Sequence, residues 1–215
     1  MAHPRLNDAE LIGRIAEVFR ERGYEGSSLS ELAAAVGLEK GSLYHRFPGG
    51  KDEMVGAVIS MVDSCFEENV FPVLRGNGTP RERAAKAARL LCEFYGAGTK
   101  ACTLDTLSLP TSNKSLHKSI RGSAQSLMNA FTRLAEECQV THGEAARRAQ
   151  NAIVTLEGSL IYARVLGDTG PFLRFIDELP NMLTRKPTVS RKRRMRRSGV
   201  LPKNLLPGID RGQRG

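Results

Sequence analysis

Two short helical segments on either side of Gly37 are the feature that most constrains this fold. Apolar residues recur at helical spacing over residues 29–36 and over residues 40–46, and Gly37 supplies the tight turn between them. A longer amphipathic segment, residues 8–22, precedes them and is ended by Gly23. A short helix, a tight turn and a second short helix packed on a third form a helix-turn-helix unit. The pattern therefore predicts a three-helix module at the start of the chain.

The helix predicted over residues 40–46 has an inner and an outer face. Leu43 and Phe47 are four residues apart, so they share one side of the helix and can face the rest of the module. That orientation turns outward small, hydrogen-bonding and aromatic residues: Gly41, Ser42, Tyr44 and His45. Such a helix suits the major groove of DNA, because the backbone can approach closely at Gly41 and the Ser42 hydroxyl can reach a base edge or a phosphate. Tyr44 and His45 have the length and the donors to reach phosphates.

Two residues outside this helix suit an anion at the same surface. Ser28 is placed to cap a helix N-terminus, whose free N–H groups can hold a phosphate, and Lys51 stands where the next helix begins. Each observation also has a purely structural interpretation. Ser28 can be a cap without a ligand, Lys51 a solvated lysine, and Tyr44 a half-buried aromatic residue of the core.

The rest of the chain is also expected to be helical. Three capping boxes, Ser28 to Glu31, Thr79 to Glu82 and Thr141 to Glu144, predict helix starts, and no alternating strand pattern of useful length occurs. The fold class is therefore all-α. Beyond the first module we expect an irregular stretch through residue 110 and helices over these ranges: 51 to the breaker at 76–78, 80–95, 114–138, 142–166 and 171–183.

The positive charge is concentrated at the end of the chain. The formal net charge is +9, but residues 185–215 alone contain eleven Lys or Arg and one acidic residue, Asp210. We expect this tail to be disordered, either solvated without a specific role or acting as an accessory clamp on DNA phosphates. The expected organisation is a helix-turn-helix domain over 1–50, a helical effector-binding and dimerisation domain over 51–184, and the basic tail over 185–215.

Composition excludes several other classes of protein. The chain contains no run of apolar residues long enough to cross a membrane and no secretion signal, so we expect a cytoplasmic protein that does not interact with membranes. The four scattered cysteines, Cys65, Cys92, Cys102 and Cys138, fit reduced and buried thiols. The histidines are not spaced with them for metal binding, and phosphate-loop and nucleophile-elbow patterns are missing. We therefore expect neither an enzyme nor a bound metal or cofactor.

The first sixty residues resemble the DNA-binding signature of the TetR family of bacterial regulators. The resemblance is carried by residues 23–24, 28–33, 36–47 and 51–54. It implies contact with operator DNA from Ser28, Lys40, Ser42, Tyr44, His45 and Lys51. Glu39 departs from the pattern, because the family often has Ser or Thr there and an acid repels phosphates. We expect Glu39 to cap the helix or to face solvent.

The remaining sequence resembles a subgroup of that family. Residues 102–109 and 158–168 are similar to the LmrA/YxaF-like regulators, which are repressors that respond to drugs or metabolites. The function expected from this resemblance is a repressor that is released from DNA by a hydrophobic small-molecule effector. Effector binding would favour a dimer whose recognition helices are wrongly spaced, through a pendulum motion of the helix that begins at residue 51.

A homodimer is expected because one recognition helix reads too few base pairs to find an operator. Such modules bind as two-fold pairs, with half-sites of a palindrome about 34 Å or multiples of it apart. The helix over 142–166 is apolar nearly all round, and with the helix over 171–183 it can form a four-helix interface. The candidate interface residues are Ile153, Leu160, Ile161, Phe172, Phe175 and Leu179.

An effector chamber is expected between these helices and the middle of the chain. Its candidate lining residues are Phe94, Tyr95, Leu104, Leu107, Phe131 and Tyr162, although apolar residues at helical spacing can equally be core. Glu157 also belongs to this candidate site, because a carboxylate on so apolar a helix needs a partner or a shifted pKa. The two interpretations are a structural ion pair with Arg164 and recognition of a cationic effector.

Two other functions remain alternatives. A regulator could sense oxidants or electrophiles through the thiol of Cys92 or Cys102. An adaptor could keep the helix-turn-helix fold and bind a protein in place of DNA.

Overall fold

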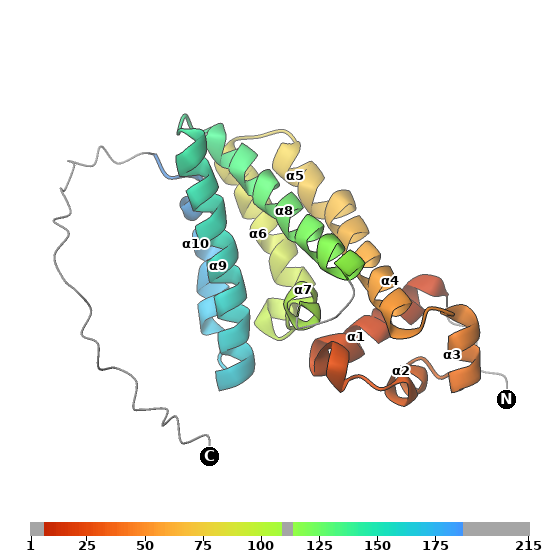
Figure 1. The fold of residues 1–215 in the computed structure, drawn as a ribbon. Helices are drawn as coiled ribbons and strands as arrows, with labels where there is room; N and C mark the ends of the chain where they lie inside the picture. Colours follow the sequence, from red (N-terminus) through yellow and green to blue (C-terminus); the bar gives the residue numbers. More distant parts are fainter. Residues whose placement is uncertain (1–6, 109–113, 187–215) are drawn as a thin grey trace, which may run out of the picture.

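The computed structural model describes residues 7–108 and 114–186, and all regular secondary structure in these ranges is helical. The all-α prediction is confirmed. Figure 1 shows a small head formed by the first three helices, from which a long helix leads into a larger helical body. The α-helices are α1 (Asp8–Gly26), α2 (Leu29–Ala35), α3 (Lys40–Arg46), α4 (Gly50–Cys65), α5 (Phe71–Arg75), α6 (Pro80–Phe94), α7 (Thr103–Leu107), α8 (Lys114–Glu136), α9 (His142–Leu166) and α10 (Gly170–Thr184). The expected disorder of the tail concerns residues that lie almost wholly outside the described ranges.

Two hydrophobic cores divide the molecule, and α4 takes part in both. Met54 and Val58, in the first half of α4, pack with the buried residues of α1, α2 and α3. Val62, one turn further on, packs with the core formed by α6, α8, α9 and α10. The packing of the head therefore continues beyond residue 50, where we had expected its domain to end, and α4 is a rigid connection between the two cores.

Where the sequence predicts one helix from residue 51 to the breaker at 76–78, the structure has two helices joined by a π-helical turn. The turn covers Phe66–Val70, and α5 follows with Pro72 in its first turn. Proline has no N–H to donate to the carbonyl four residues earlier, and its ring collides with that carbonyl. The preceding turn therefore widens, and the Phe71 N–H bonds to the Phe66 carbonyl, five residues back.

The stretch between α6 and α8 is more ordered than the sequence indicates. It contains a short 3-10 turn, Gly96–Gly98, and the five-residue helix α7, which packs against α1. A helix this short has no amphipathic period to detect and is stable only through its tertiary contacts. Gly98 is required here, because its φ is +92° and a Cβ would lie 2.9 Å from the Phe172 ring.

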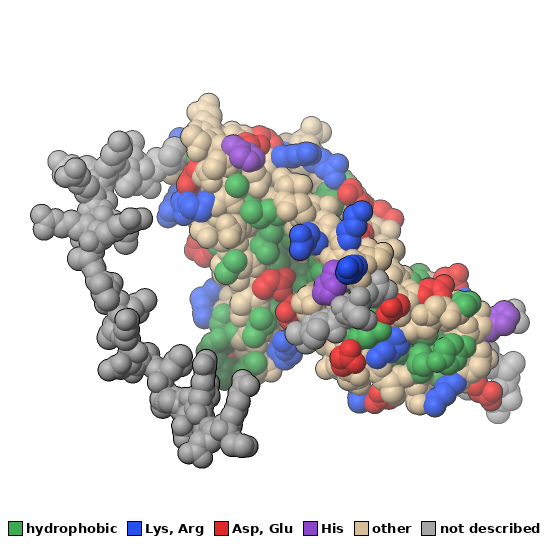
Figure 2. Space-filling view, in the orientation of Figure 1, with side chains coloured by type: hydrophobic (Ala, Val, Ile, Leu, Met, Phe, Trp, Pro, Cys, Tyr) green, Lys and Arg blue, Asp and Glu red, His purple; other side chains and the backbone are tan. Residues whose placement is uncertain are grey.

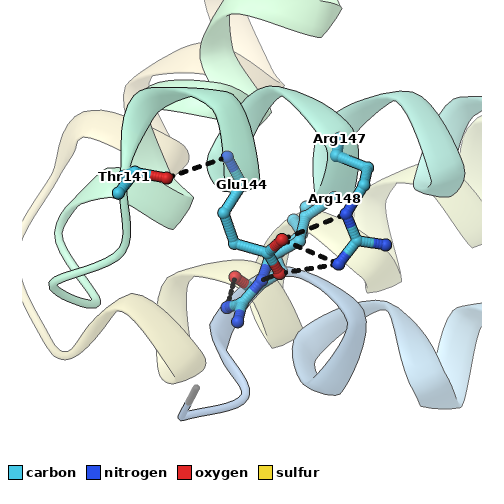
Figure 3. Close-up of polar contacts among 5 residues, drawn as sticks. Thr141, Glu144, Arg147 and Arg148 are labelled. Atoms are coloured by element: carbon cyan, nitrogen blue, oxygen red, sulfur yellow. Dashed lines mark hydrogen bonds and ion pairs between the residues drawn. The ribbon is translucent and has the colours of Figure 1, made fainter. Parts of the chain in front are cut away.

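Side-chain caps fix the starts of α1, α2, α6 and α9. The capping boxes predicted at Ser28 and Thr79 are complete, with a bond in each direction. The third is half formed, because the Thr141 hydroxyl accepts from the Glu144 N–H but the Glu144 carboxylate turns to Arg147 and Arg148 (Figure 3). Arg148 is buried and also donates to the Leu183 carbonyl at 3.2 Å, so this ion-pair network joins the start of α9 to the end of α10.

The expectation that the cysteines are buried holds for only one of the four. All four cysteines are free thiols, with Cys102 buried and the other three half-buried. No helix in the described part of the chain is long and apolar enough to cross a bilayer.

Candidate nucleic-acid interface

Helix α3 presents a polar face to solvent and anchors itself by two apolar side chains. Leu43 is fully buried and Phe47 is 7% exposed, and both belong to the core of the head. Tyr44 is 47% exposed, and all the other residues of the outer face, Gly41, Ser42 and His45, are exposed as well. The predicted orientation of this helix is confirmed. The exposed groups are hydroxyl, imidazole and phenol, which can all hydrogen-bond to phosphates or base edges.

The turn between α2 and α3 fixes the angle of that face. Gly37 has a φ of +68°, and its N–H bonds to the Ala34 carbonyl, while the Leu38 N–H returns to the Ala33 carbonyl at 2.9 Å. Glu39 occupies the N-cap position of α3 without forming a side-chain cap, and it is exposed. Of the two positions expected for Glu39, the structure has the solvent-facing one. Lys40 follows it at the exposed start of the helix.

Lys51 is held inside the head by bonds that the sequence did not predict. Its ammonium donates to the Tyr24 carbonyl at 2.7 Å and to the Ser27 carbonyl at 3.0 Å, and it lies 4.3 Å from the centre of the Tyr24 ring. These bonds place Lys51 beside Ser28, whose hydroxyl accepts from the Glu31 N–H at 3.2 Å. Lys51 therefore ties the start of α4 to the end of α1 at the N-terminus of α2.

Tyr24 completes this junction. Its hydroxyl donates to Asp52 Oδ1 at 2.5 Å, and burial together with the neighbouring Asp52 carboxylate raises the pKa of Tyr24 to about 12. The phenol therefore remains a hydrogen-bond donor at all physiological pH values.

Arg46, at the end of α3, is a further residue that the sequence analysis missed. Its guanidinium forms an ion pair with Asp8 at the start of α1. The pair holds the end of the recognition helix against α1, and both partners are substantially exposed.

The residues expected to line an effector chamber lie in three places: the core of the body, the core of the head and the surface. Phe94, Tyr95 and Phe131 pack in the core of the body, where the Phe94 and Tyr95 rings meet edge to face at 5.0 Å. Leu107 packs instead in the core of the head, and Leu104 touches both cores. Tyr162 is 43% exposed on the outside of α9. Leu107 and Tyr162 therefore do not lie with the other expected residues. Leu107 belongs to the core of the head, and Tyr162 faces solvent.

Glu157 lies at the inner side of α9 without the expected ion pair. Its Oε2 atom is buried and forms no hydrogen bond with the described residues, and Arg164 instead pairs with Asp105 of α7 at 3.5 Å. The expected Glu157–Arg164 pair is wrong because two helical turns put the residues about 10 Å apart along the axis. Burial raises the pKa of the Glu157 carboxyl, while a hydrogen bond with the Cys102 thiol acts in the opposite direction.

Cys102 is placed unfavourably for thiol chemistry. It is 4% exposed, the Tyr95 hydroxyl contacts its sulfur at 3.8 Å, and burial together with the Glu157 charge raises the pKa of the thiol to about 12. A thiol with this pKa contains almost no reactive thiolate near neutral pH. The geometry thus argues against thiol sensing through Cys102.

Most of the expected dimer-interface residues are core residues of the single chain. Leu160, Phe172, Phe175 and Leu179 are at most 3% exposed, because the apolar side of α10 packs on α6 and α9 of the same chain. Ile153 is half-buried, and Ile161 is 41% exposed. The apolar residues that remain exposed lie mainly on the outer face of α9, over which Figure 2 shows hydrophobic side chains: Val154, Ile161, Tyr162, Val165 and Leu166, with Leu173 of α10.

A helix-turn-helix head on a helical body, with a polar recognition helix, defines the class of DNA-binding transcriptional regulators. Residues 11–58 match the family described as bacterial regulatory proteins, tetR family. The matched residues run from α1 to the first half of α4, so the head of this chain is similar to the DNA-binding domain of the TetR family of transcriptional regulators.

Comparison over most of the chain finds similar regulators and a similar fold. The HTH-type transcriptional regulator LmrA of Bacillus subtilis (strain 168) is 24% identical over 190 residues, which cover 82% of this chain and 96% of LmrA. A TetR regulator from Legionella pneumophila has a similar fold, with a TM-score of 0.71 and 21% identity over 83% of this chain and 98% of its own. A cysteine mutant of the TetR regulator CifR, in complex with 26 bp of operator DNA, covers 86% of this chain and 100% of its own with a TM-score of 0.66 and 20% identity.

Proposed function

We propose that this protein binds a palindromic operator as a homodimer, represses transcription there, and is released by a hydrophobic small-molecule effector. The observation that carries the proposal is the orientation of α3. Leu43 and Phe47 anchor the helix, and the hydroxyl, phenol and imidazole groups of Ser42, Tyr44 and His45 are free to meet a duplex. A protein that acts on the operators of a bacterial chromosome works in the cytoplasm.

The proposed DNA contacts divide into two groups. Residues of α3 enter the major groove: Lys40, Gly41, Ser42, Tyr44 and His45. Ser28 and Lys51 lie together at the N-terminus of α2 and would hold one phosphate, since the free N–H groups of that helix end and the Lys51 charge favour an anion. Two of the three ammonium donors of Lys51 are used within the head, which fixes the charge in place and leaves one donor for DNA.

The proposed dimer uses the outer face of α9. Val154 and Val165 are 63% and 70% exposed, and Ile161 and Tyr162 between them are 41% and 43% exposed. A contiguous apolar surface of this kind on a helix typically marks a protein–protein interface. Two copies packed through α9 would present two recognition helices to successive turns of DNA, as an operator with two half-sites requires.

The proposed effector site is the body around Glu157. Its buried Oε2 atom forms no hydrogen bond with the described residues, and the edge-to-face rings of Phe94 and Tyr95 belong to the same core. A ligand that supplies a hydrogen bond or a positive charge there would gain from a buried acceptor that is otherwise unsatisfied. Rearrangement of α7 on binding would reach the DNA-binding head, because α7 packs against α1.

The decisive experiment is a footprint of the purified protein on the DNA flanking its own gene. The expected result is a protected, two-fold symmetric region whose half-sites are one helical turn or a multiple of it apart. Affinity for that DNA should fall steeply with salt, because phosphate contacts release counterions. A protein that protects no symmetric site, or whose affinity for its operator is the same with and without a saturating effector, would contradict the corresponding part of the proposal.

A further inference from the structure

A cleft of about 490 Å³ separates the DNA-binding head from the body. It lies between α1, the turn that follows α6 and the C-terminal end of α9, which Figure 1 shows on the same side of the molecule. This volume is within the range of roughly 300 to 1,000 Å³ typical of small-molecule sites. None of the residues expected to form the effector chamber lines it.

Arg20 of α1 is an oriented cationic group in the wall of this cleft. Its side chain is 8% exposed, its Nε donates to the Thr103 hydroxyl at 2.8 Å and its Nη1 donates to Glu17 Oε1 at 2.8 Å. The guanidinium carbon lies 5.3 Å from the centre of the Phe94 ring. These contacts fix the plane of the guanidinium, while the other terminal nitrogen, Nη2, forms no hydrogen bond with the described residues.

Two more cations line the cleft, and both are exposed enough to exchange partners. Lys100 reaches Glu17 Oε1 at 3.2 Å, and Arg164 reaches Asp105 at the longer distance of 3.5 Å. Exposed pairs of this kind contribute little to stability, so a ligand can replace them at small cost. Glu17 and Glu21 are the carboxylates of the lining, and Glu17 already has two cationic partners. With three cations against two carboxylates, the lining carries one positive charge in excess, and this favours an anionic ligand.

The opposite wall is apolar. It is formed by the buried side chains of Leu160 and Ala163 on α9 and by the half-buried Ala101. We propose that this cleft binds a small organic carboxylate, with the carboxylate at Arg20, Lys100 and Arg164 and an apolar body against Leu160 and Ala163. Inorganic phosphate would leave the apolar wall uncovered, and a neutral ligand would offer the cations only uncharged acceptors, which bind them more weakly than a carboxylate.

The position of the cleft gives such a ligand a regulatory effect. Arg20 belongs to the helix that supports the recognition helix, whereas Leu160 and Arg164 belong to the body. One bound molecule would contact both parts and would therefore restrict the orientation of the head. This site is separate from the proposed effector site at Glu157, and its ligand can be tested without DNA.

Benzoate is a suitable probe, with its neutral isostere benzamide and inorganic phosphate as comparisons. Each is titrated into ¹⁵N-labelled full-length protein, and the Arg20 Nε–H signal, identified by its loss in Arg20→Lys, is followed by NMR. We expect saturable binding of benzoate with a shift of this signal. Combined replacement of Lys100 and Arg164 by Ala should weaken it at least about tenfold, since charge-assisted hydrogen bonds are lost.

The matched control is Arg89→Ala, which removes an exposed arginine of α6 outside the cleft. It should leave benzoate affinity unchanged. The proposal is overturned if benzoate does not bind, if benzamide or phosphate binds as tightly, or if the control variant weakens binding as much as the double variant. All these outcomes are independent of operator binding, so they do not depend on the proposed function.

Discussion

The Arg20 Nε of α1 donates to the Thr103 hydroxyl of α7 at 2.8 Å, a buried hydrogen bond between residues 83 positions apart in the sequence. It joins the DNA-binding head to a short helix of the body. Arg164 reaches the same short helix from α9 through Asp105. Side-chain contacts thus link helix α7 both to α1 and to α9.

Replacing Arg20 by Met should destabilise this junction. The substitution keeps most of the apolar stem but leaves the Thr103 hydroxyl without its buried donor, and we expect the free energy of unfolding to fall by about 2 to 4 kcal/mol. Urea denaturation measures the effect. The control is Arg14→Met, which removes an exposed pair with Glu10 and should cost about 0.5 kcal/mol or less. Equal losses in the two variants would show that the Arg20 contact contributes nothing specific.

The two faces of α3 should respond differently to substitution. Tyr44→Ala removes a side chain that is 47% exposed, so we expect operator affinity to fall by about tenfold or more with little change in stability. Leu43→Ala removes a fully buried side chain and should lower the free energy of unfolding by about 2 to 5 kcal/mol. Fluorescence anisotropy and urea denaturation separate the two effects. A Tyr44→Ala protein that binds its operator normally would favour the adaptor function.

Glu157 should make stability depend on pH in an unusual direction. Burial raises the pKa of this carboxyl above its ordinary value of 4.5, so the folded protein binds the proton more tightly than the unfolded chain. The contribution of this group is therefore most favourable below about pH 4.5 and is lost as the pH rises through the raised pKa. Glu157→Gln should increase stability more at pH 8 than at pH 5.

Urea denaturation at the two pH values measures this difference. The matched control is Glu93→Gln, an exposed carboxylate of α6, which should show no such trend. A Glu157→Gln gain that is the same at both pH values would indicate that the ionised carboxylate is well solvated or paired in the folded protein.

Cys102 should be the least reactive of the four thiols. Its pKa of about 12 and its 4% exposure leave almost no accessible thiolate. Brief treatment of the native protein with iodoacetamide at pH 8, followed by peptide mass spectrometry, should label the half-buried Cys65 and Cys92 before Cys102. Faster labelling of Cys102, accompanied by loss of operator binding, would instead support thiol sensing.

The outer face of α9 should control assembly. A charge in place of Val165, which is 70% exposed, would be desolvated in an α9-mediated dimer, so Val165→Glu should shift the protein toward a folded monomer. Sedimentation velocity and circular dichroism report the two properties, and operator affinity should fall with the dimer. Ser126→Glu on the exposed side of α8 is the control. A Val165→Glu protein with unchanged mass would place the interface elsewhere.

Local sequence signals predicted the parts of this protein whose cause lies within a few residues. The capping pairs at Ser28 and Thr79 fixed helix starts, Gly37 fixed the turn, and the i, i+4 spacing of Leu43 and Phe47 fixed the face that α3 exposes. Each of these depends on backbone geometry and on hydrogen bonds within one or two helical turns. For the same reason the sequence showed the resemblance of the head to TetR-family regulators and led to the candidate DNA-binding surface.

Tertiary structure alone decided which distant groups become partners. An apolar stripe shows that a helix is covered but not by what, so Phe172 and Phe175 proved to be core residues and the outer face of α9 was left exposed. Arg164, which we expected to pair with Glu157, pairs with Asp105 of α7. Helix α7 is too short to be recognised from its sequence period, and it folds against α1 and beside α9. Burial and pairing depend on the three-dimensional position of the whole chain, and spacing along a single helix does not contain that information.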